Sequence, residues 1–105
     1  MDKATINEVV NFLKESLIQS GISVHSIALF GSALSGKMDE ESDIDLIIIS
    51  EDFRDKDIFE RSELTMAPEI RTFKKYKVPI DILNMSPEEY SELNMKKIYL
   101  SKIVA

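Results

Sequence analysis

The sequence predicts an α/β protein of the α+β kind: a small mixed sheet of three or more strands, with helices packed mainly on one face. Apolar residues recur at helical spacing in the first twenty positions and again after residue 57. Between these stretches lie short β-branched runs, of which residues 44–49 are the most apolar. A chain of 105 residues leaves little room for a second domain, so we expect a single domain over residues 1–105.

The first element is expected to be a helix over residues 5–20. Thr5 and Glu8 have the spacing of a capping box, and Gly21 stands where glycine commonly follows a helix end. A strand follows over residues 23–30, because this stretch is apolar and β-branched. Residues 33–37, after it, suit a short helical turn. The helical face is apolar at Ile6, Val9, Val10, Leu13, Leu17 and Ile18.

The middle of the chain predicts a central strand and then helices. Residues 44–49 read as a strand that is buried on both faces, and the charged residues 51–57 read as a loop. Helical spacing then resumes, and Pro68 predicts an interruption with a second helix after it. In this second helix we expect Ile70 and Phe73 to face inward.

The last part of the chain predicts one more strand and one more helix. Residues 78–83 form the strand, since Pro79 is tolerated at a strand start or edge. Ser86-Pro87-Glu88-Glu89 is a strong helix start, with a serine cap, proline at the first position and acids in the first turn. We expect this helix to continue toward the C-terminus.

Composition excludes several classes of site. Cysteine is absent, which rules out disulfides and thiolate metal sites, and His25 is the sole imidazole. The longest apolar runs are too short to span a membrane, and residues 1–4 lack the apolar core of a signal peptide. We therefore expect a soluble cytoplasmic protein that does not associate with a membrane.

The net charge of −6 bears on the ligand. Proteins that bind extended nucleic acid usually present a basic face, and here basic residues cluster only within residues 71–77 and at 96–97. Extended nucleic-acid binding is therefore disfavoured. A nucleotide stays open as a ligand, because divalent metal ions bridge carboxylates and phosphates.

A Gly-Ser turn is the first part of the candidate site. Gly31 follows the strand at 23–30, where glycine lets the backbone turn tightly and approach a ligand. The amides after it would open a short helix, where anions bind well, and the Ser32 hydroxyl can donate to a phosphate oxygen.

Aspartates form the second part of the candidate site. Asp43 and Asp45 are two apart on a predicted strand, so their carboxylates point the same way and require a positive partner such as Mg²⁺. Asp81 lies in an apolar strand and needs a partner or a metal as well. If the two strands are neighbours, three carboxylates share one face, can hold two metal ions, and leave Asp81 able to accept a proton from an attacking hydroxyl.

This pattern resembles a known group. Gly-Ser, ten residues, Asp-x-Asp and a later strand aspartate are similar to the DNA polymerase β-like nucleotidyltransferase superfamily. Within it, the chain looks most like the minimal nucleotidyltransferases, which are the antitoxin partners of HEPN-domain toxins. The resemblance covers most of the chain and is carried by residues 29–32, 42–46, 59–61, 80–83 and 86–90.

The resemblance implies a fold and a function. The fold would be that of the polymerase β-like nucleotidyltransferases. Gly31 and Ser32, with Asp43 and Asp45, would hold the nucleotide, while Asp43, Asp45 and Asp81 would be the catalytic and metal-binding triad. The chain would be a protein adenylyltransferase that uses ATP and two Mg²⁺ ions. It would transfer AMP to a tyrosine of a HEPN toxin, as the antitoxin of a type VII toxin–antitoxin system.

Two alternatives remain open from the sequence. The chain is either such an enzyme or a catalytically weak or inactive binding module that neutralises its partner by occlusion, through exposed apolar surface around the C-terminal helix. A small-molecule acceptor, such as an aminoglycoside, is disfavoured by the short chain. Assembly with the toxin, or with a second copy of this chain, is equally left open.

Overall fold

A four-stranded mixed sheet organises the computed structural model, which describes residues 3–31, 43–96 and 101–105. The strands lie in the order β3-β2-β1-β4, with β1 antiparallel to both of its neighbours and β2 parallel to β3. The elements are α1 (Lys3–Gln19), β1 (Ser26–Phe30), β2 (Ile44–Ile49), the 3₁₀ turn η1 (Glu51–Phe53), α3 (Ile58–Tyr76), β3 (Ile80–Met85), α4 (Pro87–Lys96) and β4 (Ser101–Ile103).

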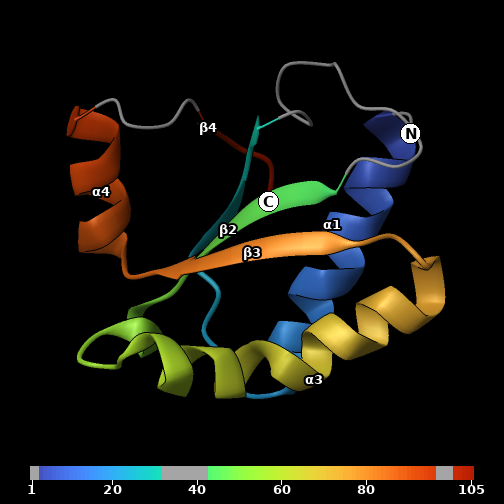
Figure 1. Cartoon of the computed structure of the whole chain (residues 1–105), viewed down its shortest axis with the longest axis horizontal. Helices are drawn as coiled ribbons and strands as arrows, with labels where there is room; N and C mark the ends of the chain where they lie inside the picture. Colours follow the sequence, from blue (N-terminus) through green and yellow to red (C-terminus); the bar gives the residue numbers. More distant parts are fainter. Residues whose placement is uncertain (1–2, 32–42, 97–100) are drawn as a thin grey trace.

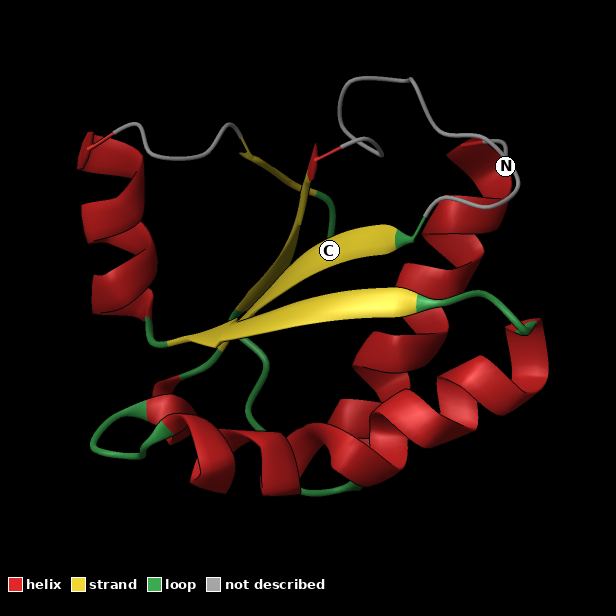
Figure 2. Ribbon diagram, viewed as in Figure 1, coloured by secondary structure: helices red, strands yellow, loops and turns green. Residues whose placement is uncertain are grey.

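Helices α1 and α3 lie together on one side of the sheet, and α4 stands apart from them (Figure 1; Figure 2). The larger core joins the apolar face of α1 to the alternate β2 residues Ile44, Leu46 and Ile48. A smaller core on the opposite face joins Ile47 and Ile49 to side chains of α4. The expected α+β class with helices mainly on one face is thereby confirmed. None of the helices described is both long enough and apolar enough to cross a bilayer.

Three expected elements begin or end differently in the structure. Helix α1 begins at Lys3, so the expected N-cap at Thr5 is wrong, and Thr5 lies inside the helix. The first strand begins at Ser26 rather than at residue 23, and the strand expected over 78–83 is displaced to Ile80–Met85. Gly21, the second residue after α1, has a φ of +91°, as expected of a glycine that follows a helix end. The short helical turn expected at residues 33–37 falls outside the described residues.

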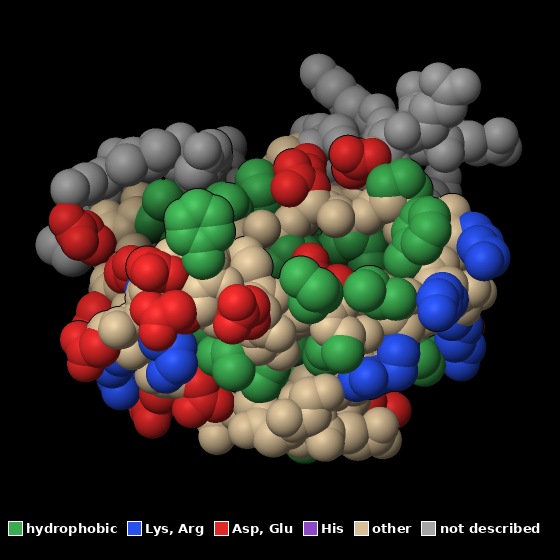
Figure 3. Space-filling model, turned by 60° about the horizontal axis from the view of Figure 1, so that its bottom comes forward, with side chains coloured by type: hydrophobic (Ala, Val, Ile, Leu, Met, Phe, Trp, Pro, Cys, Tyr) green, Lys and Arg blue, Asp and Glu red, His purple; other side chains and the backbone are tan. Residues whose placement is uncertain are grey.

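The predicted break at Pro68 is wrong, because α3 runs through it without interruption. Pro68 is buried on the inner side of the helix, and its carbonyl accepts a hydrogen bond from Thr72 Oγ1 at 2.8 Å. The inward orientation expected for Ile70 and Phe73 is also wrong, since they are 47% and 48% exposed. Figure 3 shows hydrophobic side chains spread over the surface on this side of the molecule.

The last strand was not expected. Instead of continuing toward the C-terminus, α4 ends at Lys96, and Ser101–Ile103 pairs with β1 as β4. Beyond the strand, Val104 N–H donates to the Ile27 carbonyl at 2.9 Å, and Ile27 N–H donates to the Ala105 carbonyl at 3.0 Å. These bonds give β1 a partner on each side and make it an interior strand.

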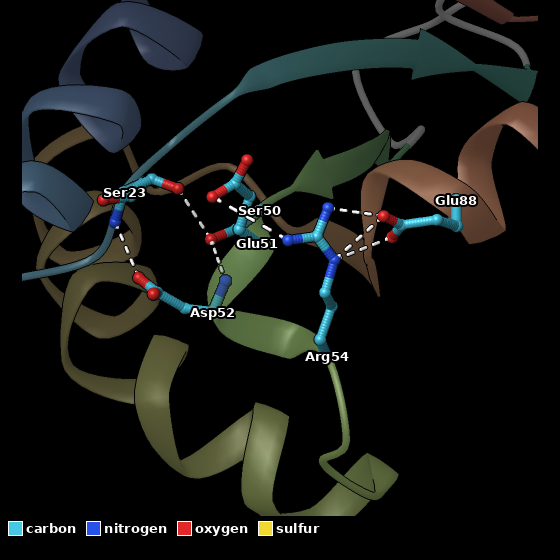
Figure 4. A network of polar contacts seen from close by, with 6 residues as sticks. All are labelled: Ser23, Ser50, Glu51, Asp52, Arg54 and Glu88. Carbon is cyan, nitrogen blue, oxygen red and sulfur yellow. Dashed lines mark hydrogen bonds and ion pairs between the residues drawn. The ribbon is translucent and has the colours of Figure 1, made fainter.

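The loop expected at 51–57 contains a polar network that ties η1 to its surroundings (Figure 4). The Ser50 hydroxyl donates to the Ser23 carbonyl at 2.6 Å and accepts the Asp52 N–H at 3.0 Å. The Asp52 carboxylate in turn accepts the Ser23 N–H at 2.8 Å. On the other side of η1, Arg54 binds Glu88 in the first turn of α4. This network fixes the end of β2 relative to the segment before β1 and to α4.

Candidate active site

Asp45 and Asp81 are direct partners in the parallel pair of β2 and β3. Each is the second residue of its strand, so both carboxylates lie near the same end of the sheet. Residues that match in register on neighbouring strands point to the same face of a sheet. The two carboxylates therefore share one face, which is the face that carries α4.

Asp43 lies just before β2 and is exposed. It is two residues from Asp45, and its negative charge is among the causes that raise the pKa of Asp45. Asp81 acts on Asp45 in the same way, so both other aspartates lie near Asp45 at this end of the sheet.

Gly31 lies directly against this group. Its φ of +66° is a left-handed conformation that side chains disfavour. A β-carbon placed on Gly31 would lie 2.3 Å from Oδ2 of Asp45, which is closer than any real contact of this kind. Only a glycine therefore leaves the Asp45 carboxylate its present position. Ser32, the other predicted residue of the turn, lies outside the described residues.

The sequence reasoning did not single out Phe30 as part of the site. Phe30 pairs with Asp45 across the antiparallel β1–β2 ladder and packs with the smaller core. Asp45 is thus flanked by an aromatic side chain on one neighbouring strand and by Asp81 on the other. The only sequence signal for Phe30 was its position directly before Gly31. That position does not show which face of the sheet the side chain occupies, because the strand register is needed for that.

The charge distribution of the site is unbalanced. Burial raises the pKa of Asp45 above its ordinary 3.8, and the charges of Asp81 and then Asp43 raise it further. None of the ion pairs formed by the described residues involves these three aspartates. The cluster is therefore a region of negative charge that favours a bound cation.

Comparison with known proteins now bears on the chemistry. A family model for the nucleotidyltransferase domain matches residues 6–104, nearly the whole chain. The chain belongs to the nucleotidyltransferase domain family. Among curated protein sequences, none matches this nucleotidyltransferase domain.

Solved structures resemble this nucleotidyltransferase domain in fold at low sequence identity. A protein from Sulfolobus solfataricus assigned as a nucleotidyltransferase gives a TM-score of 0.58 at 17% identity, over 96% of this chain and 87% of that one. A toxin–antitoxin structure with AMP-PNP gives a TM-score of 0.58 at 20% identity, and the match covers 90% of this chain and 71% of that one. BolA1 from Arabidopsis thaliana gives a TM-score of 0.53 at 17% identity, and the match covers 77% of this chain and 94% of that one. Similarity of fold alone therefore does not establish the activity, which depends on the residues of the site.

The donor set of this nucleotidyltransferase domain suits a hard divalent cation. Within residues 3–31, 43–96 and 101–105, no three acidic or histidine side chains converge closely enough to form a ready-made metal cage. Such a cage is not required for Mg²⁺, which is usually held by one or two carboxylates and keeps waters and substrate phosphates as its other ligands. Asp43, Asp45 and Asp81 fit that description, because they are neighbouring carboxylates whose repulsion a cation would relieve.

Proposed function

We propose that this chain transfers AMP from ATP to a hydroxyl acceptor, with Mg²⁺ bound at the aspartates. The observation that supports this most strongly is the register of Asp45 with Asp81 beside Gly31, in a chain of the nucleotidyltransferase domain family. A carboxylate pair next to a glycine turn combines metal ligands with a backbone that a triphosphate can approach closely.

Each residue has a role in the proposed reaction. Gly31 and Ser32 hold the triphosphate, and Asp43 and Asp45 hold the metal ions, with Asp81 as the third acid. Bound metal ions supply positive charge that stabilises the entering and leaving oxygens. The acceptor oxygen forms a bond to the α-phosphorus of ATP while the bond to pyrophosphate breaks. Asp81 accepts the proton that the hydroxyl loses, and pyrophosphate leaves with the electron pair.

The acceptor that we propose is a tyrosine hydroxyl on a HEPN-type toxin, which makes the chain its antitoxin. The fold likeness to a toxin–antitoxin structure that contains AMP-PNP, an ATP analogue, supports this choice. The resemblance of the Gly-Ser and Asp-x-Asp motifs to minimal nucleotidyltransferases supports it independently.

Transfer of label from [α-³²P]ATP to a co-purified partner protein tests the proposal. Substitution of asparagine for both Asp43 and Asp45 should lower the rate of labelling by about 10²-fold or more, because metal and phosphate charges are then uncompensated. Asp81→Asn should lower it comparably through loss of the proton acceptor, on the order of 10²–10⁴-fold.

Asp55→Asn is the matched control. Asp55 is exposed and lies elsewhere on the chain, and its φ of +59° is a conformation that asparagine tolerates. Circular dichroism establishes that each variant is folded. Undiminished labelling by the Asp43/Asp45 double variant would refute the proposal that the chain transfers AMP at these aspartates. A dead variant that still neutralises the toxin in cells would favour neutralisation by occlusion.

A further inference from the structure

Helix α3 carries an apolar stripe that the fold does not use. Of the eight large hydrophobic side chains that are exposed among the described residues, six belong to α3 rather than to the C-terminal helix. Four of them, Phe59, Met66, Ile70 and Phe73, are spaced seven, four and three apart, which places them on one helical face. Their exposures are 77%, 54%, 47% and 48%.

The inner face of α3 contrasts with this stripe. The buried residues of the helix are Thr65, Pro68 and Thr72, so its largest apolar groups lie outside. Exposed apolar surface that is bordered by charged residues often marks a site of protein association. The charges around the stripe indicate what covers it.

Charges on the same helical face are divided along its length. Glu63 lies in the first half of the helix, Lys74 lies in its last turn, and Lys77 caps its end. Glu69, between them, is half-buried, and its carboxylate accepts a hydrogen bond from Thr65 Oγ1 at 2.6 Å. Figure 3 shows Lys and Arg side chains gathered at the right of the view, the side on which α3 ends in Figure 1. A helix with opposite charges at its two ends is complementary to an antiparallel copy of itself, whereas a parallel copy would place like charges together.

We propose that two copies of this chain associate through antiparallel packing of α3 on α3. A register centred near residue 68 places Met66 of each copy against Ile70 of the other. The same register brings Glu63 of each copy close to Lys74 of the other. Apolar contacts in the middle are then flanked at each end by opposite charges, as in the core and rim of a specific interface.

A hollow beside α3 matches the remaining member of the stripe. It has a volume of about 580 Å³, and its lining includes Phe73, Lys77 and Pro79. In the proposed register, Phe59 of one copy lies opposite Lys77 of the other. Phe59 is the most exposed residue of the stripe and is the side chain that would enter this hollow.

The association leaves the aspartates open. Asp45 and Asp81 point to the face of the sheet that carries α4, and α3 lies with α1 on the other side. The inference is therefore independent of the proposed enzymatic activity.

Sedimentation equilibrium of the whole chain provides the test. The wild type should reach twice the 12.0 kDa mass of one chain. Ile70→Glu should shift the dissociation constant at least tenfold toward the monomer. Ile18→Glu is the matched control, because Ile18 is 53% exposed on α1 and lies outside the stripe; it should sediment like the wild type.

Charge reversal distinguishes self-association from other uses of the stripe. Glu63→Lys and Lys74→Glu should each weaken the dimer when alone, because both place like charges together at both ends. An equimolar mixture of the two variants should form a heterodimer, because opposite charges then meet at both ends. A monomeric wild type, an unaffected Ile70→Glu variant, or failure of the mixture to associate would overturn the proposal. Binding of a different protein to the stripe, without self-association of this chain, would overturn the proposal as well.

Discussion

A β-carbon at position 31 would lie 2.3 Å from Oδ2 of Asp45, so the backbone of Gly31 rests directly against a carboxylate of the candidate site. This contact connects the end of β1 to the start of β2, and it depends on the absence of a side chain at one residue.

Gly31→Ala should destabilise the protein by more than its backbone strain alone. The left-handed conformation costs about 1–2 kcal/mol for a residue with a β-carbon, and displacement of Asp45 adds to this. Urea unfolding should therefore give a smaller cost for Gly31→Ala in an Asp45→Ala background, where the clashing atoms are gone. Gly21→Ala is the control, since a β-carbon there meets nothing within 4 Å and its cost should be equal in both backgrounds.

Asp45→Asn should stabilise the metal-free protein at neutral pH. The pKa of Asp45 is raised in the folded state, first by burial and then by Asp81 and Asp43. The folded protein then binds this proton more tightly than the unfolded chain does, so this carboxyl's contribution to stability falls as pH rises above 3.8. Removing the charge should gain on the order of 0.5 kcal/mol at pH 7, since solvent screens a partly exposed group.

Thermal unfolding in EDTA between pH 7 and pH 3 measures this gain. The difference between Asp45→Asn and the wild type should shrink as pH falls, because the wild-type carboxyl becomes protonated in both states. A variant that is less stable than the wild type at pH 7 would contradict the expectation.

Arg61→Ala should cost about 2–3 kcal/mol of stability. The side chain is only 14% exposed, and its guanidinium donates to the carbonyls of Lys56 and Asn84, both at 2.9 Å. It also donates to Glu89 at 2.7 Å, so one residue joins α3, β3 and α4. Arg61→Lys should recover little of this lost stability, because a lysine ammonium cannot make the several hydrogen bonds of a planar guanidinium.

Equilibrium unfolding measures the cost at Arg61, and Lys3→Ala is its control. Lys3 is exposed in the first turn of α1 and should change stability by about 0.5 kcal/mol or less. A cost at Arg61 no greater than the cost at Lys3 would show that the three bonds contribute nothing.

Glu88 should titrate far below an ordinary glutamate. Hydrogen bonds from Arg54 are the first cause that lowers its pKa, from 4.5 to about 2. The favourable pairing is present above pH 4.5 and is lost as pH falls toward about 2. NMR titration of the carboxyl should show this midpoint, and Arg54→Gln should return it toward 4.5. An unshifted midpoint in the wild type would contradict the pairing.

The aspartates of the site were accessible to sequence reasoning to different degrees. The alternation of a strand is local, so the spacing of Asp43 and Asp45 is enough to predict a common orientation for them. The proximity of Asp81 depends on β3 lying next to β2 in parallel, which no local pattern determines. The contact between Gly31 and Asp45 requires the β1–β2 register as well, so the sequence supplied the residues but not their contact.

Helix α3 and strand β4 were missed for a related reason. Local rules predict a break at Pro68 and inward positions for Ile70 and Phe73, but burial of the threonine face turns the apolar residues outward. Strand β4 has only three residues, Ser-Lys-Ile, which carry no periodic signal. Its conformation comes from pairing with β1, so it exists only once the sheet is formed.

The matched positions of Asp45 and Asp81 make the length of one connection critical. Only Lys77, Val78 and Pro79 separate the end of α3 from the first residue of β3. Deleting one of these residues, or inserting a fourth, would advance or delay the strand by a single step and turn every side chain in it to the opposite face of the sheet. Asp81 would then be driven under α3 among aliphatic groups, and an isoleucine would take its place beside Asp45. Homologous chains that keep this acid pair should therefore tolerate substitutions in the connection but not a change in its length.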